Sequence, residues 1–400
     1  MMFDLPYEIT LLLTFGVSFL VTYLSIPSIL GVARERKFFD EPNIRKSHIK
    51  KIPTLGGVAI FAGITIAAGS FINYSLVPSL QYILVACIII FFIGLKDDIL
   101  SIAPLKKLMG QIAAALVLII PENLRFSSLH GFLKMDFWGI SFDGIYHIPE
   151  IAGILLTLFV IIVVINSFNL IDGIDGLAAS VGIVVSAFFG IWFFISGNIE
   201  YCLISVAMFG ALLGFFRYNM FGGKNKIFMG DTGSLIVGLM MAVQLIMFNE
   251  KNIGYTSAFS IKSAPAVSFA VLIVPLYDTM RVFLIRMLRG RSPFSADKNH
   301  LHHCLLKLGC SHIQTTLIIV LANLFFITLA LLLQNIGIVW LMLLILSIAT
   351  VLSNFVEYRL KRKHPIPVEA KQKRKKHKAA EKLAKKRGNY PRSTCSDNIA

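Results

Sequence analysis

Long runs of apolar residues alternate with short polar loops along this chain. A transmembrane helix needs about 20 apolar residues to cross the hydrocarbon core of a bilayer, and about eleven segments approach that length. They cover residues 7–33, 55–73, 80–95, 106–120, 150–168, 177–197, 201–218, 233–248, 265–288, 315–334 and 336–357. The fourth segment is the weakest, because it is short and begins with Lys106 and Lys107. The pattern predicts an all-α, polytopic membrane protein with about eleven transmembrane helices.

Composition agrees with this interpretation. The 400 residues are 56% hydrophobic and 15% charged, and the mean hydropathy is +0.75. Soluble domains are about 45–50% apolar and about 25% charged. A water-soluble fold could not bury this much apolar surface, so the composition excludes an ordinary soluble enzyme.

Positive charge predicts the orientation of the spans, because cytoplasmic loops collect Lys and Arg. The loop 34–54 holds seven such residues, and placing it inside puts the amino terminus outside. Alternation then puts the carboxyl-terminal tail inside, together with the loops 96–107, 169–176, 217–232 and 289–314. Only four basic residues remain outside: Arg125, Lys134, Lys251 and Lys262.

The carboxyl-terminal end carries most of the net charge. From residue 359 onward there are 15 Lys and Arg against three acids, which gives +12 of the chain's +16. After a membrane span, attraction to anionic lipid headgroups explains such a segment more simply than nucleic-acid binding. We therefore expect a transmembrane catalytic domain over 1–358 and a basic, disordered cytoplasmic tail over 359–400.

The longest predicted outside loop, about 121–149, contains an alternating stretch from Met135 to Ile148 with an Asp-Gly pair. Alternation of apolar and polar residues around such a pair is typical of a β-hairpin. The sequence therefore predicts a short extracytoplasmic β-hairpin beside the helices.

Four polar clusters stand at the inner ends of predicted spans. Each has an ordinary structural explanation by itself, since Asp residues cap helices and Asp-Gly forms turns. The clusters contain Asp97 and Asp98; Asn169, Asp172 and Asp175; Asp231; and Asp297, His300, His302 and His303.

Considered together, the first three clusters bring five carboxylates to one membrane face, where they would repel one another. Acids at membrane depth are costly and usually functional. A hard divalent cation relieves the repulsion, and Mg²⁺ takes oxygen ligands together with substrate phosphates. The carboxylates therefore indicate a Mg²⁺ site, with Mn²⁺ as an alternative occupant.

The histidine cluster and the first basic loop allow more than one interpretation. The histidines, with Cys304 and Cys310, are zinc-type ligands, but their spacing is too compressed for a four-ligand finger. They are also suited to phosphate binding beside basic side chains. In the loop before the second span, Arg45, Lys46, His48 and Lys51 could bind a phosphate or reflect only the positive-inside bias.

These motifs resemble the polyprenyl-phosphate N-acetylhexosamine-1-phosphate transferases, which form glycosyltransferase family 4. The resemblance covers about residues 34–315. It rests on the Pro-Asn-x-Arg-Lys-x-His loop, Asp97-Asp98, the segment 166–176, the segment 228–234 and the run from Pro275 to His303. It implies a Mg²⁺-dependent enzyme of the bacterial inner membrane, with its active site in the cytoplasm. The implied reaction transfers a sugar 1-phosphate from a UDP-N-acetylhexosamine to undecaprenyl phosphate, releases UMP and starts synthesis of a cell-surface polysaccharide such as lipopolysaccharide.

The resemblance also suggests roles for individual residues. As a hypothesis, Asp231 holds Mg²⁺ with Asp98 or Asp172 close by, and Asp97 orients the attacking lipid phosphate or accepts its proton. The remaining predicted roles are in substrate binding. They concern the uridine and ribose (Asn169, Asp175, Phe228 and Asn219) and the diphosphate or sugar (Arg45, Lys46, His48, Lys51, His300, His302 and His303).

Several alternatives remain at this point. The related phospho-MurNAc-pentapeptide transferases share the aspartates but have three consecutive histidines where this chain has His-Leu-His-His. That difference, with Arg45-Lys46-x-His48, favours UDP-GlcNAc or a close epimer. A secondary transporter is an alternative of another class, although its ionisable residues would lie near mid-membrane. The sequence does not identify the amino sugar or establish whether the chain forms a homodimer.

Overall fold

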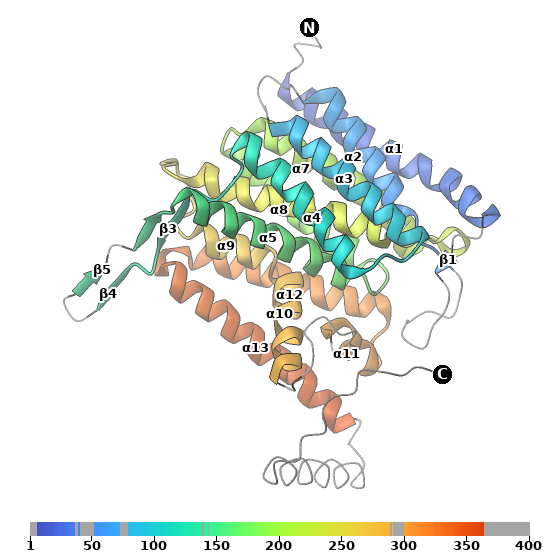
Figure 1. The fold of residues 1–400 in the computed structure, drawn as a ribbon. Coiled ribbons are helices and arrows are strands. Elements are labelled where there is room, and N and C mark those ends of the chain that lie inside the picture. Colours follow the sequence, from blue (N-terminus) through green and yellow to red (C-terminus); the bar gives the residue numbers. More distant parts are fainter. Residues whose placement is uncertain are drawn as a thin grey trace, which may run out of the picture.

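The computed structural model describes residues 6–36, 39–40, 52–72, 79–137, 140–142, 144–288, 290 and 300–363. Helices dominate these ranges (Figure 1). The first eight are α1 (Tyr7–Glu35), α2 (Gly56–Phe71), α3 (Ser79–Ile99), α4 (Pro104–Glu122), α5 (Glu150–Ile171), α6 (Leu177–Ile195), α7 (Ile199–Phe221) and α8 (Gly230–Asn252). The others are α9 (Ala264–Val271), α10 (Ile273–Leu288), α11 (Leu301–Lys307), α12 (His312–Leu332) and α13 (Ile338–Lys363). Two short 3₁₀ helices, η1 (Gly223–Asn225) and η2 (Gln334–Ile336), precede α8 and α13.

Helix α8 forms the centre of the bundle. It packs against α2, α3, α5, α6, α7 and α9, and 19 of its 23 residues are buried. Its apolar side chains surround the whole helix, as expected for a helix without a solvent face. Gly238 lets α5 approach closely, because a Cβ there would lie 2.8 Å from the Cα of Ile165. The first residues of α8 are therefore held in place by the surrounding bundle.

The polytopic, all-α class predicted from the sequence is confirmed, but the predicted number of spans is slightly too high. Among the described residues, nine helices are long and apolar enough to cross a membrane, or ten if α9 and α10 form one bent span. The second predicted segment contains only the 16-residue helix α2, which is short for a full crossing.

The break between α9 and α10 bends the chain by 82°. Pro275 explains where it falls, because a continuous helix would need its missing N–H to bond the carbonyl of Val271, four residues earlier. Helix α9 ends at Val271, and Pro275 lies in the first turn of α10, where a proline is tolerated. As a result, α10 runs across the direction of its neighbours (Figure 1).

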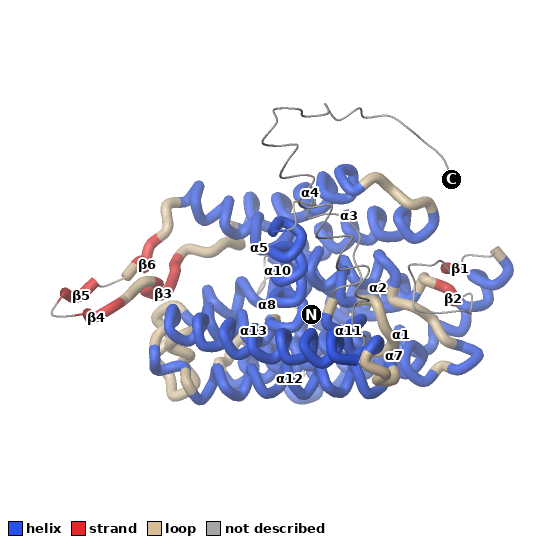
Figure 2. Tube along the Cα trace, turned by 90° about the horizontal axis from the view of Figure 1, so that it is seen from below, coloured by secondary structure: helices blue, strands red, loops and turns tan. Residues whose placement is uncertain are grey.

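Short strands confirm the predicted hairpin. Strand β4 (Met135–Phe137) pairs antiparallel with β5 (Ile140–Phe142), and β3 (Ser128–Phe132) pairs with β6 (Ile145–His147). These strands project from one side of the helical bundle (Figure 2). They lead into the start of α5, whereas the loop with Asp172 and Asp175, called the acidic loop below, follows the end of α5. The hairpin and the acidic loop therefore lie at opposite ends of this helix, as the alternation of spans requires.

Two further features concern segments that the sequence predicts to be cytoplasmic. Strands β1 (Phe39–Asp40) and β2 (Ile52–Pro53) pair antiparallel, and they flank a segment outside the described residues. Helix α13 continues to Lys363, five residues beyond the predicted domain boundary at 358. The rest of the predicted tail lies outside the described residues.

Candidate active site

Three of the four predicted polar clusters meet at the start of α8. Asp97 and Asp98 lie in the last turn of α3, Asp172 and Asp175 lie between α5 and α6, and Asp231 lies in the first turn of α8. Direct contacts join these elements, as described below. The sequence therefore predicted correctly that the carboxylates gather at one end of the bundle.

Asp98 caps the amino terminus of α8. One of its carboxylate oxygens accepts the backbone N–H of Asp231 at 2.7 Å, and the other accepts that of Thr232 at 2.9 Å. The hydroxyl of Thr232 donates to the second oxygen as well. A carboxylate at this position satisfies unpaired helix N–H groups and contributes about 1 kcal/mol. Asp98 thus fixes the position of Asp231, and its predicted role as a metal ligand remains a prediction.

Glycine is required beside this cap. Gly230 has φ +70°, and a Cβ at this position would lie 2.1 Å from the Thr54 carbonyl oxygen and 2.7 Å from both carboxylate oxygens of Asp98. A side chain would therefore displace Asp98 as well as strain the backbone. The sequence suggested only that the glycine allows close approach, and the structure identifies the approaching group as a carboxylate.

Lys107 joins two of the predicted carboxylates and was not predicted as a site residue. Its Nζ lies 3.0 Å from Asp97 Oδ2 and 2.6 Å from Asp231 Oδ1. The other oxygen of Asp97 accepts the backbone N–H of Ile102 at 2.8 Å. The sequence did contain an indication of this role, because Lys107 is a charge at the start of an apolar segment. The sequence analysis considered it only as a weakness of the fourth predicted span. A cation within an apolar segment usually has an anionic partner.

Asn169 also contacts Asp231. Its side-chain amide donates to Asp231 Oδ1 and, at 2.8 Å, to the hydroxyl of Ser234. One turn earlier on α5, Asn166 exchanges two hydrogen bonds with Gln111 of α4, at 2.7 and 3.3 Å. This pair fixes α4 against α5, and so places Lys107 and Asn169 on the same carboxylate. The predicted contact of Asn169 with the nucleotide stays a prediction.

Asp172 differs from the other carboxylates. It is half-buried, and among the described residues its carboxylate has no hydrogen-bond or ion-pair partner. Burial raises the pKa of Asp172 to about 8, and the negative charges of Asp231, Asp98 and Asp175 contribute to that increase. An unpaired carboxylate among other carboxylates is a position that a cation would stabilise.

Asp175, three residues later, is compensated within the protein. It pairs with Lys226 and with His312, whose Nδ1 lies 2.8 Å from Oδ2. Burial acts to raise the pKa of Asp175, but the hydrogen bonds and positive charges of His312 and Lys226 hold it below its usual value. Asp175 therefore connects the acidic loop to Lys226, directly after η1, and to α12, and its predicted contact with uridine or ribose stays a prediction.

The histidine segment, His300 to His303, is held in place by a series of connected ion pairs. His300 Nδ1 lies 2.9 Å from Asp278 Oδ2, and the backbone N–H of Leu301 donates to Asp278 Oδ1 at 3.0 Å. Arg281 contacts Asp278 at 3.4 Å and also pairs with Glu357 of α13. Charges on α10 and α13 thus position the start of α11.

His302 brings this segment to the acidic loop. A Cβ added to Gly173 would lie 2.6 Å from His302 Nε2, so the ring packs directly against the residue after Asp172. The ring centroid of His303 lies 4.2 Å from that of His302. Burial, followed by the charge of His303, lowers the pKa of His302 to about 3. His302 is therefore neutral at physiological pH and can contact a phosphate only as an N–H donor.

Asn219 and Phe228 connect backbone segments beside the site. Asn219 is 4% exposed, accepts the N–H of Gly176 at 2.7 Å and donates to the Ile227 carbonyl at 2.9 Å. Phe228 is half-buried, and its backbone N–H and carbonyl bond to Pro53 and Gly56. The ammonium of Lys226 lies 5.8 Å from the centre of its ring. Their predicted nucleotide contacts stay predictions.

Several predicted residues lie outside the described residues. They are Arg45, Lys46, His48, Lys51 and Asp297. Among the described residues, no three His, Cys, Asp or Glu side chains form a group that could hold a metal ion. The carboxylate and amide oxygens of Asp172, Asp231 and Asn169 nevertheless fit the chemistry of Mg²⁺, which prefers oxygen ligands and completes its shell with water and phosphate.

The fold and the site define a polytopic membrane protein with a carboxylate-lined polar site at the ends of its helices. Residues 80–249 match the family described as Glycosyl transferase family 4. The undecaprenyl-phosphate alpha-N-acetylglucosaminyl 1-phosphate transferase of Escherichia coli O157:H7 is 31% identical over 76% of this chain and 78% of its own length. The decaprenyl-phosphate N-acetylglucosaminephosphotransferase of Mycobacterium tuberculosis (strain CDC 1551 / Oshkosh) is 33% identical over 76% and 77%. This chain belongs to glycosyl transferase family 4, as its motifs predicted.

Proposed function

We propose that this protein transfers N-acetylglucosamine 1-phosphate from UDP-GlcNAc to a polyprenyl phosphate and releases UMP. Family membership supports this reaction class, because the curated relatives named above are transferases of that kind. The structural observation that carries the proposal is the assembly of three helix ends, in which Lys107 joins Asp97 and Asp231 and the charge of Asp231 acts on Asp172. The relatives' names do not favour the phospho-MurNAc-pentapeptide or transporter alternatives.

In the proposed reaction, an oxygen of the lipid phosphate attacks the β-phosphorus of UDP-GlcNAc. The new P–O bond forms as the bond between the β-phosphorus and the bridging oxygen breaks, and that oxygen leaves with UMP. Positioning and charge stabilisation supply most of the catalysis in such phosphoryl transfers. An ionised phosphate needs no strong base, so the main role of Asp97 is to orient groups rather than to remove a proton.

Lys107 is the central cation in this scheme. An ammonium group has three N–H donors, and two of them face Asp97 and Asp231. We assign its third donor to a phosphate oxygen of the donor substrate. Asp97 and Asp231 would then hold Lys107 in place, while Asn169 holds Asp231. Removal of any member of this group would misplace the others.

Mg²⁺ fits beside this group. Asp172 and Asp231 would hold it, because Asp172 is the carboxylate without an internal partner and its charge is coupled to that of Asp231. A bound Mg²⁺ supplies positive charge for the diphosphate. His302 would donate one hydrogen bond to a phosphate or to the sugar, since it packs beside Asp172's neighbour Gly173.

The proposal includes a membrane and an orientation. The apolar helices show a multi-pass membrane protein. We propose the bacterial inner membrane, with the site in the cytoplasm and the acceptor undecaprenyl phosphate. The charged head of such a lipid lies at the interface, where the ends of α3, α5 and α8 would meet it. A reporter enzyme that works only in the cytoplasm should be active when fused after α13. A reporter that works only outside the cytoplasm should be inactive at the same position.

A reconstituted assay tests the reaction. Purified protein is mixed with undecaprenyl phosphate, Mg²⁺ and one of three donors: UDP-GlcNAc, UDP-GalNAc or UDP-MurNAc-pentapeptide. We expect UMP release with UDP-GlcNAc only when both lipid and metal are present. Release that continues without lipid, or after chelation of the metal, would refute the proposal. Preference for the muramyl donor would correct the substrate.

A further inference from the structure

A buried hydrogen bond joins α12 to the break between α9 and α10. The side-chain amide of Asn323 donates to the backbone carbonyl of Val271 at 3.2 Å, and both residues are fully buried. Because a carbonyl oxygen only accepts hydrogen bonds, the atom of Asn323 that faces it is the amide nitrogen. Asn323 follows the last of the sequence motifs, and the proposed reaction gives it no role.

The carbonyl that Asn323 bonds is the one that Pro275 cannot bond. In a continuous helix, the N–H of residue 275 would donate to the carbonyl of Val271, but a proline has no N–H. One residue later, the usual spacing is restored, because the N–H of Leu276 donates to the Leu272 carbonyl at 3.1 Å. Asn323 thus supplies, from another helix, the donor that the proline removed.

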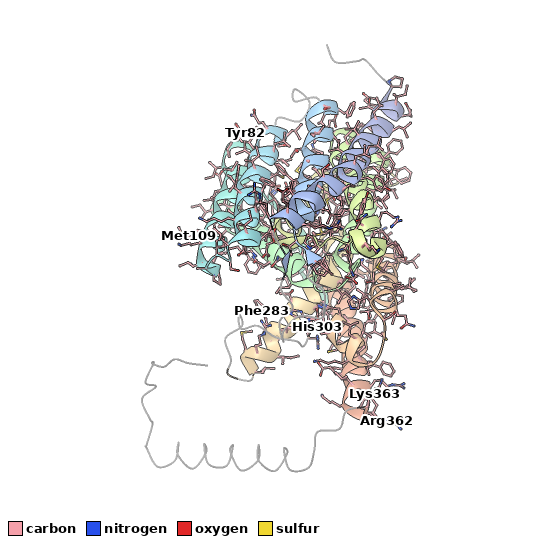
Figure 3. The ribbon with its side chains drawn as sticks, turned by 90° about the vertical axis from the view of Figure 1, so that its right-hand side faces the viewer. Tyr82, Met109, Phe283, His303, Arg362 and Lys363 are labelled. Carbon is pink, nitrogen blue, oxygen red and sulfur yellow. The ribbon has the colours of Figure 1, made fainter. Side chains whose placement is uncertain are left out.

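This bond lies at the point that sets the direction of α10. The two helices are bent by 82° at the break, and Val271 is the last residue of α9. Asp278 lies about 10 Å further along the chain, so a change of about 10° at the break would move it by about 2 Å. Asp278 is the residue through which α10 holds His300 and Leu301. Figure 3 shows α10, labelled at Phe283, leaving the bundle on the same side as His303.

The same face of α12 also holds the acidic loop. His312 pairs with Asp175, and the hydroxyl of Thr316 donates to the Asp175 carbonyl at 3.0 Å. Thr316 and Asn323 are about two turns apart and therefore lie on one face of this helix. That face is bonded to the acidic loop near the start of α12 and to the break between α9 and α10 further along.

Two other contacts attach α10 to α13. The hydroxyl of Tyr277 lies 2.9 Å from that of Ser353, and Arg281 pairs with Glu357. These contacts hold α10 beyond the break, but they do not connect it to the helix that holds the acidic loop. The bond of Asn323 makes that connection.

We propose that Asn323 is a positioning residue that sets the distance between the acidic loop and the histidine segment. Its bond to Val271 fixes the start of α10 against the helix that holds Asp175. Asp278 then presents His300 at a constant distance from the acidic loop. The effect of Asn323 on binding of the UDP-sugar rests on the proposed function, whereas its effect on the direction of α10 does not.

Three substitutions test this role. Asn323→Leu removes the donor with little change in side-chain volume. Thr328→Val is the matched control, because Thr328 is exposed on the same helix and its hydroxyl bonds only the carbonyl of Leu324 one turn earlier. Pro275→Ala restores an N–H that can bond the Val271 carbonyl, so Asn323→Leu should have little further effect in this background.

Pulsed electron paramagnetic resonance measures the direction of α10 without any reaction. Nitroxide labels are attached after Met287→Cys in α10 and Leu317→Cys in α12, at two exposed positions. Cys310 and Cys395 are replaced by serine, and the other three cysteines are buried. We expect one narrow distribution of distances between the labels when Asn323 is present.

The substitutions should change this distribution selectively. Asn323→Leu should broaden it or shift it by about 4 Å, which is the displacement of the end of α10 for a change of about 10° at the break. Thr328→Val should leave it unchanged. In the Pro275→Ala background, Asn323→Leu should cause no further change, because both substitutions act on the same carbonyl.

Steady-state kinetics separates positioning from stability. Asn323→Leu should raise KM for UDP-GlcNAc about five-fold, which is at the lower end for the loss of a buried hydrogen bond, and change kcat by less than about two-fold. A loss of stability alone would reduce the amount of active protein, and so the apparent kcat, without raising KM. In the Pro275→Ala background, Asn323→Leu should leave KM nearly unchanged.

The inference is wrong if Asn323→Leu leaves the distance distribution unchanged, or leaves KM unchanged in protein that performs the reaction. Equal effects of Asn323→Leu with and without Pro275→Ala would also overturn it. If Asn323→Leu does not fold by itself, the double variant with Pro275→Ala must fold. Its failure to fold beside a folded Pro275→Ala protein would refute the shared carbonyl. Wild-type protein that releases no UMP would refute the proposed function instead, and the distance measurements would still decide the role of Asn323.

Discussion

The site has two sides that are held in different ways. On the α8 side, Lys107 pairs with both Asp97 and Asp231. Helix N–H groups bond Asp98, and Asn169 bonds Asp231. On the α11 side, His300 is held indirectly, through Asp278 and Arg281, by Glu357 of α13. Asp172 lies between the two sides and has no such partner among the described residues. The α8 side is thus compact and preorganised, whereas the position of the histidines depends on helices outside the bundle's centre.

This difference has a chemical consequence. A compact group of paired charges keeps its geometry when substrate binds, which is the requirement for electrostatic catalysis. A segment held through a chain of pairs can adjust its distance to the substrate at little cost. We therefore expect substitutions on the α8 side to reduce turnover most, and substitutions on the α11 side to act more on substrate binding.

The largest effect is expected for Asp231→Asn. It removes a charge from the group that faces Lys107 and the proposed Mg²⁺, and a metal contributes several kcal/mol to the stabilisation of transition-state charge, or about 1,000-fold in rate. Glu250→Gln is the matched control, since Glu250 lies at the other end of α8 and bonds Ser127. Steady-state UMP release should fall in the first variant only. Near-normal turnover in Asp231→Asn would remove this residue from the metal site.

Lys107→Met should come next. It removes the cation shared by Asp97 and Asp231 and the proposed donor to the phosphate. Loss of one such donor costs about 100- to 1,000-fold in kcat, so kcat should fall at least about 100-fold. Lys106→Met is the control, because that side chain is exposed one residue away. A double-mutant cycle with Asp97→Asn should show strong non-additivity. Additive losses would contradict the assignment of the two residues to one unit.

Binding of Mg²⁺ should depend on pH through Asp172. The pKa of Asp172 in the metal-free protein is raised to about 8, so its carboxyl group is protonated at neutral pH and must lose the proton to bind the metal. Apparent affinity should therefore rise up to about ten-fold per pH unit below pH 8 and level off above it. Calorimetry in two buffers of different ionisation enthalpy measures the proton released. A flat profile from pH 6 to 8, or release unchanged in Asp172→Asn, would exclude Asp172 as a ligand.

The same titration affects stability in the metal-free protein. The folded-state pKa of Asp172 lies above its usual value, so the contribution of this group is full at low pH. It is lost as pH rises from about 4 through about 8, because ionised Asp172 is partly desolvated and lies near the charges of Asp231, Asp98 and Asp175. Metal-free wild-type protein should therefore have a lower Tm at pH 9 than at pH 6. This decrease in Tm should be larger than the decrease in the Asp172→Asn variant. Mg²⁺ should reduce that difference.

A smaller effect is expected on the α11 side. Asp278→Asn weakens the charge-assisted bond to His300, worth about 1.5–3 kcal/mol, and should raise KM for the UDP-sugar about ten-fold with less change in kcat. Glu357→Gln acts one step further away, at a partly exposed pair, and should change KM about two-fold. Lys361→Ala, which removes the other partner of Glu357, serves as the control. Equal losses in kcat for Asp278→Asn and Asp231→Asn would remove the distinction between the two sides.

The sequence predicted the parts of the site whose positions follow from the order of the spans. Asp97, Asp172 and Asp231 each follow or begin an apolar segment, so alternation alone brings them to one end of the bundle. The sequence did not show which carboxylates would be paired. Asp98 became a cap only because Gly94 and Gly230 let α3 approach the start of α8. Lys107 and Gln111 required the packing of α4 against α3 and α5, which no local pattern contains.

The number of spans illustrates the same limit. Hydropathy located the regions of α2, α9 and α10 correctly, but it averages over a window. It therefore missed that α2 has 16 residues and that Pro275 breaks the ninth segment by removing one donor. The bend matters for function, because it directs α10, and with it Asp278, toward the histidine segment.

Transfer of the β-phosphate to lipid tests the central claim most directly. UDP-GlcNAc carrying a radioactive β-phosphate is incubated with the protein, undecaprenyl phosphate and Mg²⁺, and the lipid is extracted into organic solvent. The account predicts that the label enters the lipid in a one-to-one ratio with released UMP, and that Asp231→Asn abolishes both. Label that remains with the nucleotide while the sugar alone moves to the lipid, or label in water-soluble sugar phosphate, would contradict it.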